Sequence, residues 1–359
     1  LANLQDWQQA AAKAKRDVAF VKQYPREMAG PMVLTFAEIL LRAGKVTDAQ
    51  KILSDLNPAA GTPQKKAKAP AVTGIMASIR SQHEYLLGEA ARQAGKKDEA
   101  KKYWDKLAKS NDDKYRARAR LAMTIMDYEQ GKIKATDAID QLEGLRYAWR
   151  GDEVEAAVNA RLGEIYLGRG DYLRGLNVLR DAASLVPETQ LGRRITATMS
   201  DKFRSLFLGE GMKKINPLDA ITVYEKFSEL MPVGDDANKL TFSLIDRLME
   251  VDLLDRAAAV LQKMIDTQLT GDQKLDAELR LAGIQLLNDQ PQTALKILNQ
   301  VGQRMIAVSD PSTMAARIRE MKILKARALY QDRQVDAALN ILKDAGTDLP
   351  YLRTRADIA

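Results

Sequence analysis

A short pattern recurs along the whole sequence: a small residue, two residues of any kind, and then two apolar residues. Its small residue, which we call the anchor, falls at Ala49, Ala100, Ala138, Gly175, Ala220, Ala257, Ala294 and Ala338, and the copy at Ala138 is weaker. Three intervals between successive anchors are 37 residues long and a fourth is 38. A near-constant period of this length indicates a repeat architecture, in which each repeat packs against the next.

A second small residue often lies twelve positions before the anchor, at Ala37, Gly88, Gly163, Ala282 and Ala326. This offset places the two small residues on facing helices of one hairpin. In the unit from Glu155 to Pro187, apolar stripes predict two amphipathic helices joined by a Gly-Arg-Gly-Asp turn. Neither helix can bury its stripe alone, so each hairpin needs neighbours.

The sequence therefore predicts an all-α, right-handed α-solenoid of about eight hairpins. Composition agrees, since aromatic residues are only 6% of the 359 and Pro and Gly are sparse. We place an N-terminal helix, either half of a truncated repeat or a capping helix, in residues 1–30, and the array in residues 31–345. The hairpins cover 31–56, 76–109, 113–146, 155–187, 188–231, 235–268, 271–303 and 311–345. Residues 57–74 are expected to form an inserted loop, and 346–359 a tail or the start of a further repeat.

The central unit resembles a tetratricopeptide repeat (TPR). The resemblance rests on Leu162-Gly163-x-x-Tyr166, followed by Gly175, Leu179, Ala182 and Pro187. Looser matches are Leu87-Gly88 with Ala100 and Trp104, and Leu281-Ala282 with Ala294 and Leu298. The resemblance implies a non-catalytic scaffold whose first helices line a concave surface that binds a protein or peptide.

Candidate groove residues follow from the repeat register, counted from each anchor. They are Glu89, Asp127, Arg161, Glu164, Asp246, Arg280 and Arg327. Other basic residues on first helices, such as Arg118 and Arg194, are either groove residues or part of a solvated flank. The Lys, Asn and Arg arrangement with which TPR proteins hold chaperone tails is missing, because no Asn stands at the matching positions of the central repeat.

No residue constellation for catalysis is found. The chain has no Cys, its one histidine is His83, and no G-x-S-x-G motif occurs, so we expect no enzyme activity and neither a cofactor nor a metal site. The pairs Asp112-Asp113 and Asp235-Asp236 precede predicted helices, where carboxylates favourably meet the helix dipole.

The uneven distribution of charge along the chain is compatible with functions other than a peptide-binding scaffold. Residues 1–150 carry 27 Lys and Arg against 18 Asp and Glu, whereas residues 151–359 carry 28 against 30. The basic half fits a solvated surface, or a salt-sensitive binder of nucleic acid or an anionic surface. A further alternative is a helical region of a larger envelope protein, enzymatic or not. No membrane-spanning run is present, and the chain starts at Leu1, as expected of a processed product. The missing Cys and a likeness to bacterial envelope repeat proteins favour the bacterial periplasm or cell envelope.

Overall fold

Every regular element of the protein is a helix in residues 7–56, 70–150, 153–305, 311–343 and 349–358, which are the residues that the computed structural model describes. No strand occurs in these ranges. The prediction of an all-α fold is therefore confirmed. The helices are α1 (Trp7–Val21), α2 (Arg26–Arg42), α3 (Val46–Asp55), α4 (Pro70–Gln93), α5 (Lys97–Leu107), α6 (Asp113–Glu129), α7 (Ala135–Ala148), α8 (Glu153–Gly168), α9 (Tyr172–Leu185), α10 (Gln190–Leu208), α11 (Gly211–Lys214), α12 (Pro217–Lys226), a 3₁₀ turn (Ser228–Leu230), α13 (Asp235–Glu250), α14 (Leu254–Thr267), α15 (Gly271–Leu287), α16 (Pro291–Met305), α17 (Pro311–Gln331), α18 (Val335–Ile341) and α19 (Leu349–Ile358).

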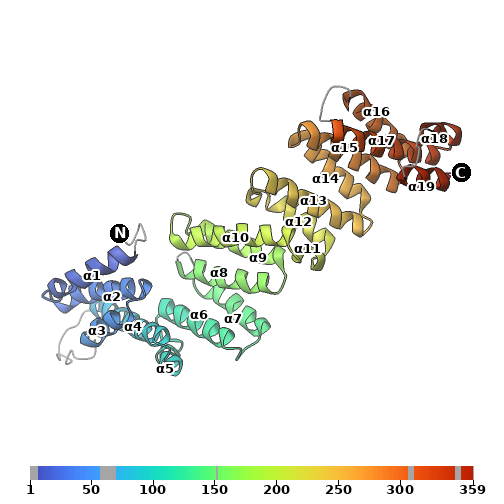
Figure 1. The fold of residues 1–359 in the computed structure, drawn as a ribbon. Helices are drawn as coiled ribbons and strands as arrows, with labels where there is room; N and C mark the ends of the chain where they lie inside the picture. The colour runs from blue at the N-terminus through green and yellow to red at the C-terminus, as the bar shows by residue number, and fades with distance from the viewer. Residues whose placement is uncertain (1–6, 57–69, 151–152, 306–310, 344–348, 359) are drawn as a thin grey trace. The chain divides into compact units, whose positions relative to one another are not determined.

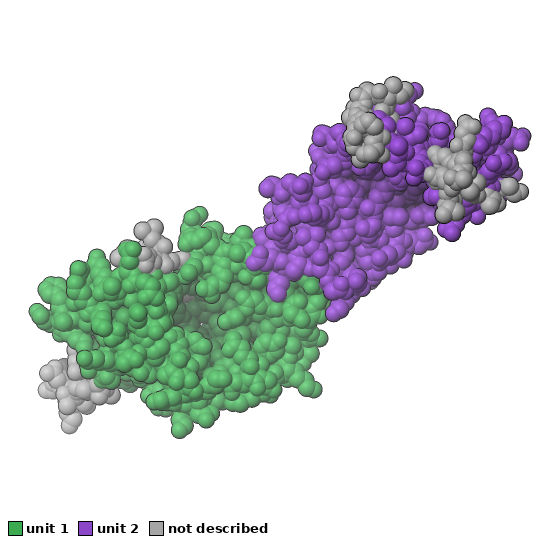
Figure 2. Space-filling model, viewed as in Figure 1, with its two compact units in different colours: residues 1–199 green, residues 200–359 purple. Residues whose placement is uncertain are grey.

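The helices pack as consecutive hairpins, which is the packing of TPR-like solenoids (Figure 1). Helix pairs α2–α3, α4–α5, α6–α7, α8–α9, α13–α14, α15–α16 and α17–α18 form hairpins. First helices also contact first helices, as α2 contacts α4 and α15 contacts α17. The chain divides into two compact units, residues 1–199 (unit 1) and 200–359 (unit 2), each coloured separately in Figure 2.

The anchors are tight helix–helix contacts, as the pattern predicts. All seven alanine anchors have zero exposed surface: Ala49, Ala100, Ala138, Ala220, Ala257, Ala294 and Ala338. A Cβ atom added to Gly163 would lie 2.6 Å from Cγ of Leu179 and 2.9 Å from the carbonyl oxygen of Gly175. A Cβ atom on Gly88 would lie 2.7 Å from Cδ1 of the fully buried Trp104. The facing helices can approach this closely only because these side chains are small.

The turn between the two helices of a hairpin contains one residue in the left-handed region. In unit 1 it is glycine, as at Gly95 (φ 78°) and Gly170 (φ 82°), five residues before the anchor. In unit 2 the same place holds Asp252, Asp289 and Arg333, with φ of 59°, 53° and 64°. Gly131 lies seven residues before its anchor, so the turn between α6 and α7 is two residues longer than the others.

The fifth hairpin departs from the others, and its sequence explains why. Its first helix, α10, is long, and the predicted break at residues 209–211 separates it from α11, while Pro217 opens α12 behind the N-cap Asn216. Twelve residues before the Ala220 anchor stands the large residue Leu208, as Met126 and Ile245 stand before the anchors Ala138 and Ala257. Aromatic side chains fill the contact: the ring centroids of Phe207 and Tyr224 are 5.9 Å apart.

Some helix boundaries differ from the prediction. Helix α2 begins at Arg26, before residue 31, and holds Pro31 in its second turn, where the proline removes only one intrahelical hydrogen bond. Helix α4 begins at Pro70, so residues 70–74 of the predicted loop are helical, because proline suits the first helical position. Residues 57–69 of that loop lie outside the described residues. At the chain ends, α1 packs on α2, and α19 packs on α17 and α18.

Candidate binding grooves

Two adjoining cavities lie along the first helices of unit 1, and together we call them the unit 1 groove. Their volumes are about 440 and 310 Å³. Helices α2, α4, α6, α8 and α10 line them, together with Trp7 of α1 and Leu179 of α9. A hollow is visible on the face of unit 1 turned to the viewer in Figure 2. First helices therefore line the groove, as the resemblance implies.

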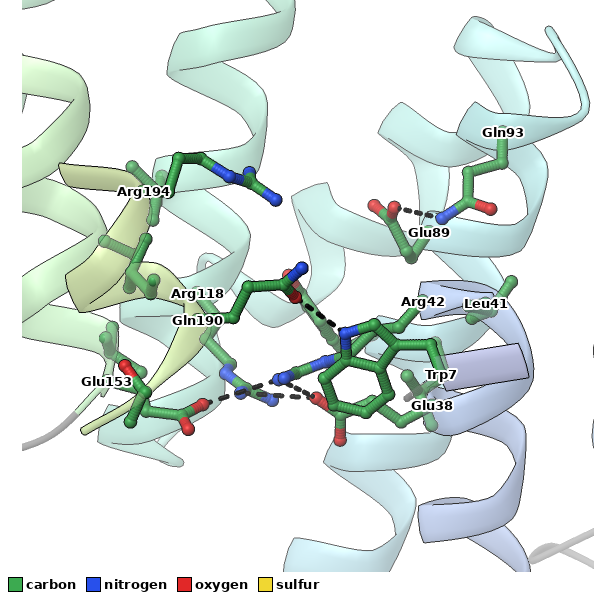
Figure 3. Close-up of a pocket in the computed structure, with 17 residues that line it drawn as sticks. Trp7, Glu38, Leu41, Arg42, Glu89, Gln93, Arg118, Glu153, Gln190 and Arg194 are labelled. Atoms are coloured by element: carbon green, nitrogen blue, oxygen red, sulfur yellow. Dashed lines mark hydrogen bonds and ion pairs between the residues drawn. The ribbon is translucent and has the colours of Figure 1, made fainter. Parts of the chain in front are cut away.

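Ion pairs between different helices lie at the end of the unit 1 groove that the 440 Å³ cavity forms (Figure 3). Arg42 of α2 lies 2.9 Å from a carboxylate oxygen of Glu38 on its own helix and 3.4 Å from one of Glu153 on α8. Arg118 of α6 lies 3.6 Å from Glu38. The charges at this end therefore neutralise one another and connect α2, α6 and α8.

Aromatic rings hold Arg118 in place. Its guanidinium carbon lies 5.3 Å from the ring centroid of Tyr85 and 5.8 Å from that of Tyr115, in cation–π geometry. Burial raises the pKa of both tyrosines to about 12, although the nearby Arg118 charge acts in the opposite direction. Both phenols therefore stay neutral at physiological pH.

Trp7 connects the first and last helices that line the unit 1 groove. Its Nε1 donates a hydrogen bond to Oε1 of Gln190 on α10 at 2.7 Å, and the guanidinium of Arg42 lies 5.0 Å from its ring centroid (Figure 3). The N-terminal helix therefore forms part of the groove wall.

Arg194 lies where the two cavities meet, and it lines both. It is exposed, and the structure shows no hydrogen bond or ion pair between it and any described residue. The other four arginines of the groove each have an acidic partner within 4 Å: Arg42 and Arg118 as above, Arg92 with Glu89, and Arg161 with Glu164. Of the five arginines that line the groove, Arg194 is thus the one without an acidic partner among the described residues.

Of the predicted residues, Glu89, Arg161 and Glu164 lie in the unit 1 groove. Arg161 and Glu164 pair at 2.8 Å, and Glu89 accepts hydrogen bonds from Arg92 at 2.6 Å and from Gln93 at 2.7 Å. These three residues therefore line the groove, and their role in binding a partner stays a prediction.

Asp127 does not line the unit 1 groove. It pairs at 3.2 Å with Lys101 of α5, a second helix. The register counted from the Ala138 anchor is displaced because the preceding turn is two residues longer. Counted from Gly131 instead, the register gives Ala122 and Ile125, and both line the groove.

The remaining predicted residues lie in unit 2, where a cavity of about 520 Å³ runs between first helices. We call it the unit 2 groove; it is lined by Met249, Leu279, Arg280, Gly283, Ile284, Leu286, Leu287, Glu320, Leu324, Arg327, Tyr330 and Gln331. Asp246 forms an ion pair with Arg280, whose guanidinium lies 5.3 Å from the ring centroid of Phe242.

Four residues of the unit 1 groove are absent from the residues predicted from the sequence: Trp7, Glu38, Arg42 and Glu153. Glu38 could have been found, since it stands six residues before the turn glycine Gly44, as Glu164 stands six before Gly170. Arg194 could not be placed by this rule, because α10 ends without such a turn.

The residues weighed for catalysis or metal binding have the following surroundings in the described parts of the chain. No group of three His, Cys, Asp or Glu that could hold a metal ion occurs in them. His83 is buried, with Nε2 2.8 Å from the carbonyl oxygen of Leu53, so this nitrogen donates a structural hydrogen bond. Asp112 is the N-cap of α6, and Asp235 and Asp236 lie in the first turn of α13, so these carboxylates stand at helix N-termini, where they meet the helix dipole favourably. Across the described ranges, no helix is both long and apolar enough to span a bilayer.

Comparison with known proteins gives distant likenesses. No family model matches the sequence, and no curated protein matches it. Among solved structures, the apo form of RapI has 11% identity and a TM-score of 0.36, covering 92% of this chain and 97% of RapI. Yeast Tom70 has 13% identity and a TM-score of 0.32, covering 98% and 87%. The TPR2AB domain of yeast Sti1, in a complex with pHSP90, has 18% identity and a TM-score of 0.28, covering 70% and 99%. All these scores are low, and the fold assignment rests on the hairpins described above.

Proposed function

We propose that the chain is a non-catalytic scaffold that binds an extended protein segment in the unit 1 groove. The observation that carries this proposal is Arg194, an exposed cation without an acidic partner among the described residues, placed where two cavities of mixed polar and apolar lining meet. Leu121, Ile125 and Leu191 supply apolar lining on either side of it. An acidic side chain of the partner would bind Arg194, and apolar neighbours would fill the cavities.

Charge balance argues against nucleic acid as the ligand of this groove. Five glutamates (38, 89, 129, 153 and 164) line the two cavities beside five arginines (42, 92, 118, 161 and 194). A phosphate backbone carries a negative charge at every nucleotide and would meet these carboxylates. A peptide with one or two acidic residues among apolar ones meets no such repulsion.

For the compartment, the absence of cysteine keeps the bacterial periplasm or cell envelope as our expectation.

Selection of short random peptides by phage display tests the proposal, followed by fluorescence anisotropy with the labelled consensus peptide. We expect selected peptides to contain an acidic residue. Arg194→Glu should weaken binding by about tenfold or more, since a charge-assisted hydrogen bond contributes roughly 1.5–3 kcal/mol. The control is Lys102→Glu on the second helix α5, which reverses an equal charge outside the groove.

Arg161→Glu should also weaken binding, by less, because Glu164 already neutralises Arg161. Peptides that bind the Arg194→Glu protein as tightly as the parent, while Lys102→Glu abolishes binding, would place the site on the second helices and contradict the proposal.

A further inference from the structure

Gly283 lies inside α15, and no described residue packs so closely on it that a glycine is required there. Glycine is unfavourable in a helix interior. At Gly163 the facing helix requires it, but a Cβ atom on Gly283 would meet nothing closer than Cδ2 of Leu324, at an ordinary contact distance of 3.8 Å. Gly283 lines the unit 2 groove. Its missing side chain therefore leaves room in that groove and not in the core.

The walls beside this space are apolar and exposed. Leu287 is 62% exposed and Tyr330 is 44% exposed, although both are large hydrophobic residues. Both line the unit 2 groove, with Leu279, Ile284 and Leu324. The groove thus offers apolar surface around a notch.

Two opposite charges flank the notch on α17. Glu320 and Arg327 are seven residues apart, so they lie on one face of the helix about 10.5 Å apart along its axis. Among the described residues, neither forms a hydrogen bond or an ion pair. Partial burial of its carboxylate, together with the nearby negative charge of Asp276, raises the pKa of Glu320. The other groove cation, Arg280, is already paired with Asp246.

We propose that the unit 2 groove binds an amphipathic helix of a partner protein. A leucine-sized side chain of that helix fills the notch over Gly283, in the way that Leu179 packs over Gly163 inside the fourth hairpin. An acidic residue of the helix pairs with Arg327, and a basic residue about seven positions away pairs with Glu320.

The shape of the groove favours a helix as the occupant. On α15, residues 280, 283 and 287 follow helical spacing, and on α17 residues 320, 324, 327 and 331 do the same. Two such ridges with a furrow between them are the surface on which a third helix packs, and glycine at the crossing point permits close approach. This site lies in unit 2 and does not depend on the proposed function of the unit 1 groove.

The test uses a fluorescein-labelled, alanine-rich helical peptide of about 20 residues, long enough to form helix in water. It carries leucines at helical spacing and one Glu and one Lys seven positions apart, and its partner peptide has the two charges exchanged. Fluorescence anisotropy measures binding of both to the full chain. We expect one of the two to bind, and Gly283→Leu to weaken that binding at least tenfold. Gly144→Leu is the matched control, since Gly144 is also helical with open space beside it, but lies in unit 1.

Charge exchange gives a second, independent readout. Arg327→Glu should weaken the preferred peptide, and changing the peptide's Glu to Lys should restore binding. The thermal midpoint of Gly283→Leu should not fall, because leucine favours helix more than glycine does. The proposal is overturned if neither peptide binds, or if Gly283→Leu binds as the parent does. It is equally overturned if the parent is a dimer that Gly283→Leu converts to a monomer, because a second copy would then fill the groove.

Discussion

Replacing Gly163 by alanine should destabilise the protein, whereas the same replacement at Gly144 should stabilise it. Both residues lie inside helices, α8 and α7, so each substitution gains about 1 kcal/mol of helix propensity. A Cβ atom on Gly144 meets no atom within 4 Å. On Gly163 it meets Leu179 at 2.6 Å and the backbone oxygen of Gly175 at 2.9 Å, and overpacking of this kind costs roughly 1–3 kcal/mol.

The difference between the two variants isolates the cost of overpacking, because the propensity gain is common to both. We expect their free energies of unfolding to differ by roughly 1–3 kcal/mol, with Gly144→Ala the more stable. Urea titration monitored by circular dichroism at 222 nm measures this difference. The urea midpoints of the two variants are compared, because a repeat array need not unfold in two states. The cost of Gly163→Ala should be smaller when Leu179 is also alanine. We therefore expect the free energy of unfolding to differ less between Leu179→Ala and the double variant than between the parent and Gly163→Ala. If Gly163→Ala proves as stabilising as Gly144→Ala, the close approach of α8 and α9 is not real and the repeat register is wrong.

Three further outcomes are expected. Arg333→Gly should stabilise unit 2 by about 0.5–1 kcal/mol in a thermal melt, because Arg333 adopts φ 64° where glycine has no steric cost, and an unchanged melt would contradict this. The free energy of unfolding should fall as pH rises from 10 to 12, because the pKa of Tyr85 and Tyr115 is about 12 in the folded chain and both ionise at lower pH when unfolded. In urea titrations over this range, Tyr85→Phe should lose less stability than the parent does. Arg317→Ala should lower the free energy of unfolding by about 2 kcal/mol, because the guanidinium binds both carboxylate oxygens of Asp276 at 2.6 and 2.9 Å. Lys296→Ala on an exposed surface should lower it by almost nothing, and equal losses would show that the Arg317 pair does not stabilise the fold.

The sequence specifies the hairpins well because their spacing has a steric cause. An anchor must be small wherever two helices approach closely, so Ala257 and Ala294 recur at 37 residues and both are fully buried. The same reasoning misplaced Asp127, because a turn of variable length lies between the anchor and the groove face. The left-handed residue of that turn, such as Gly131, gives the better register.

The interior of the unit 1 groove could not be derived from one repeat at a time. Arg42 and Glu153 are 111 residues apart, and no periodic pattern states that they meet. Whether an arginine is paired likewise depends on neighbours from other helices. Arg118 and Arg194 look alike in the sequence, but among the residues that the structure describes only Arg118 has a carboxylate within 4 Å. Such pairings follow from how the hairpins stack.

The hydrogen bond from Trp7 to Gln190 joins residues 183 positions apart, and this affects how unit 1 unfolds. In an open repeat array each hairpin touches only its neighbours, so an end can fray without disturbing the rest. Here the first helix also touches the last, together with the ion pair between Arg42 and Glu153. Fraying of either end breaks contacts at the other, so amide hydrogen exchange in α1 and in the start of α10 is coupled. Closing so long a loop also raises the contact order, which slows the folding of unit 1 relative to an array of purely local hairpins.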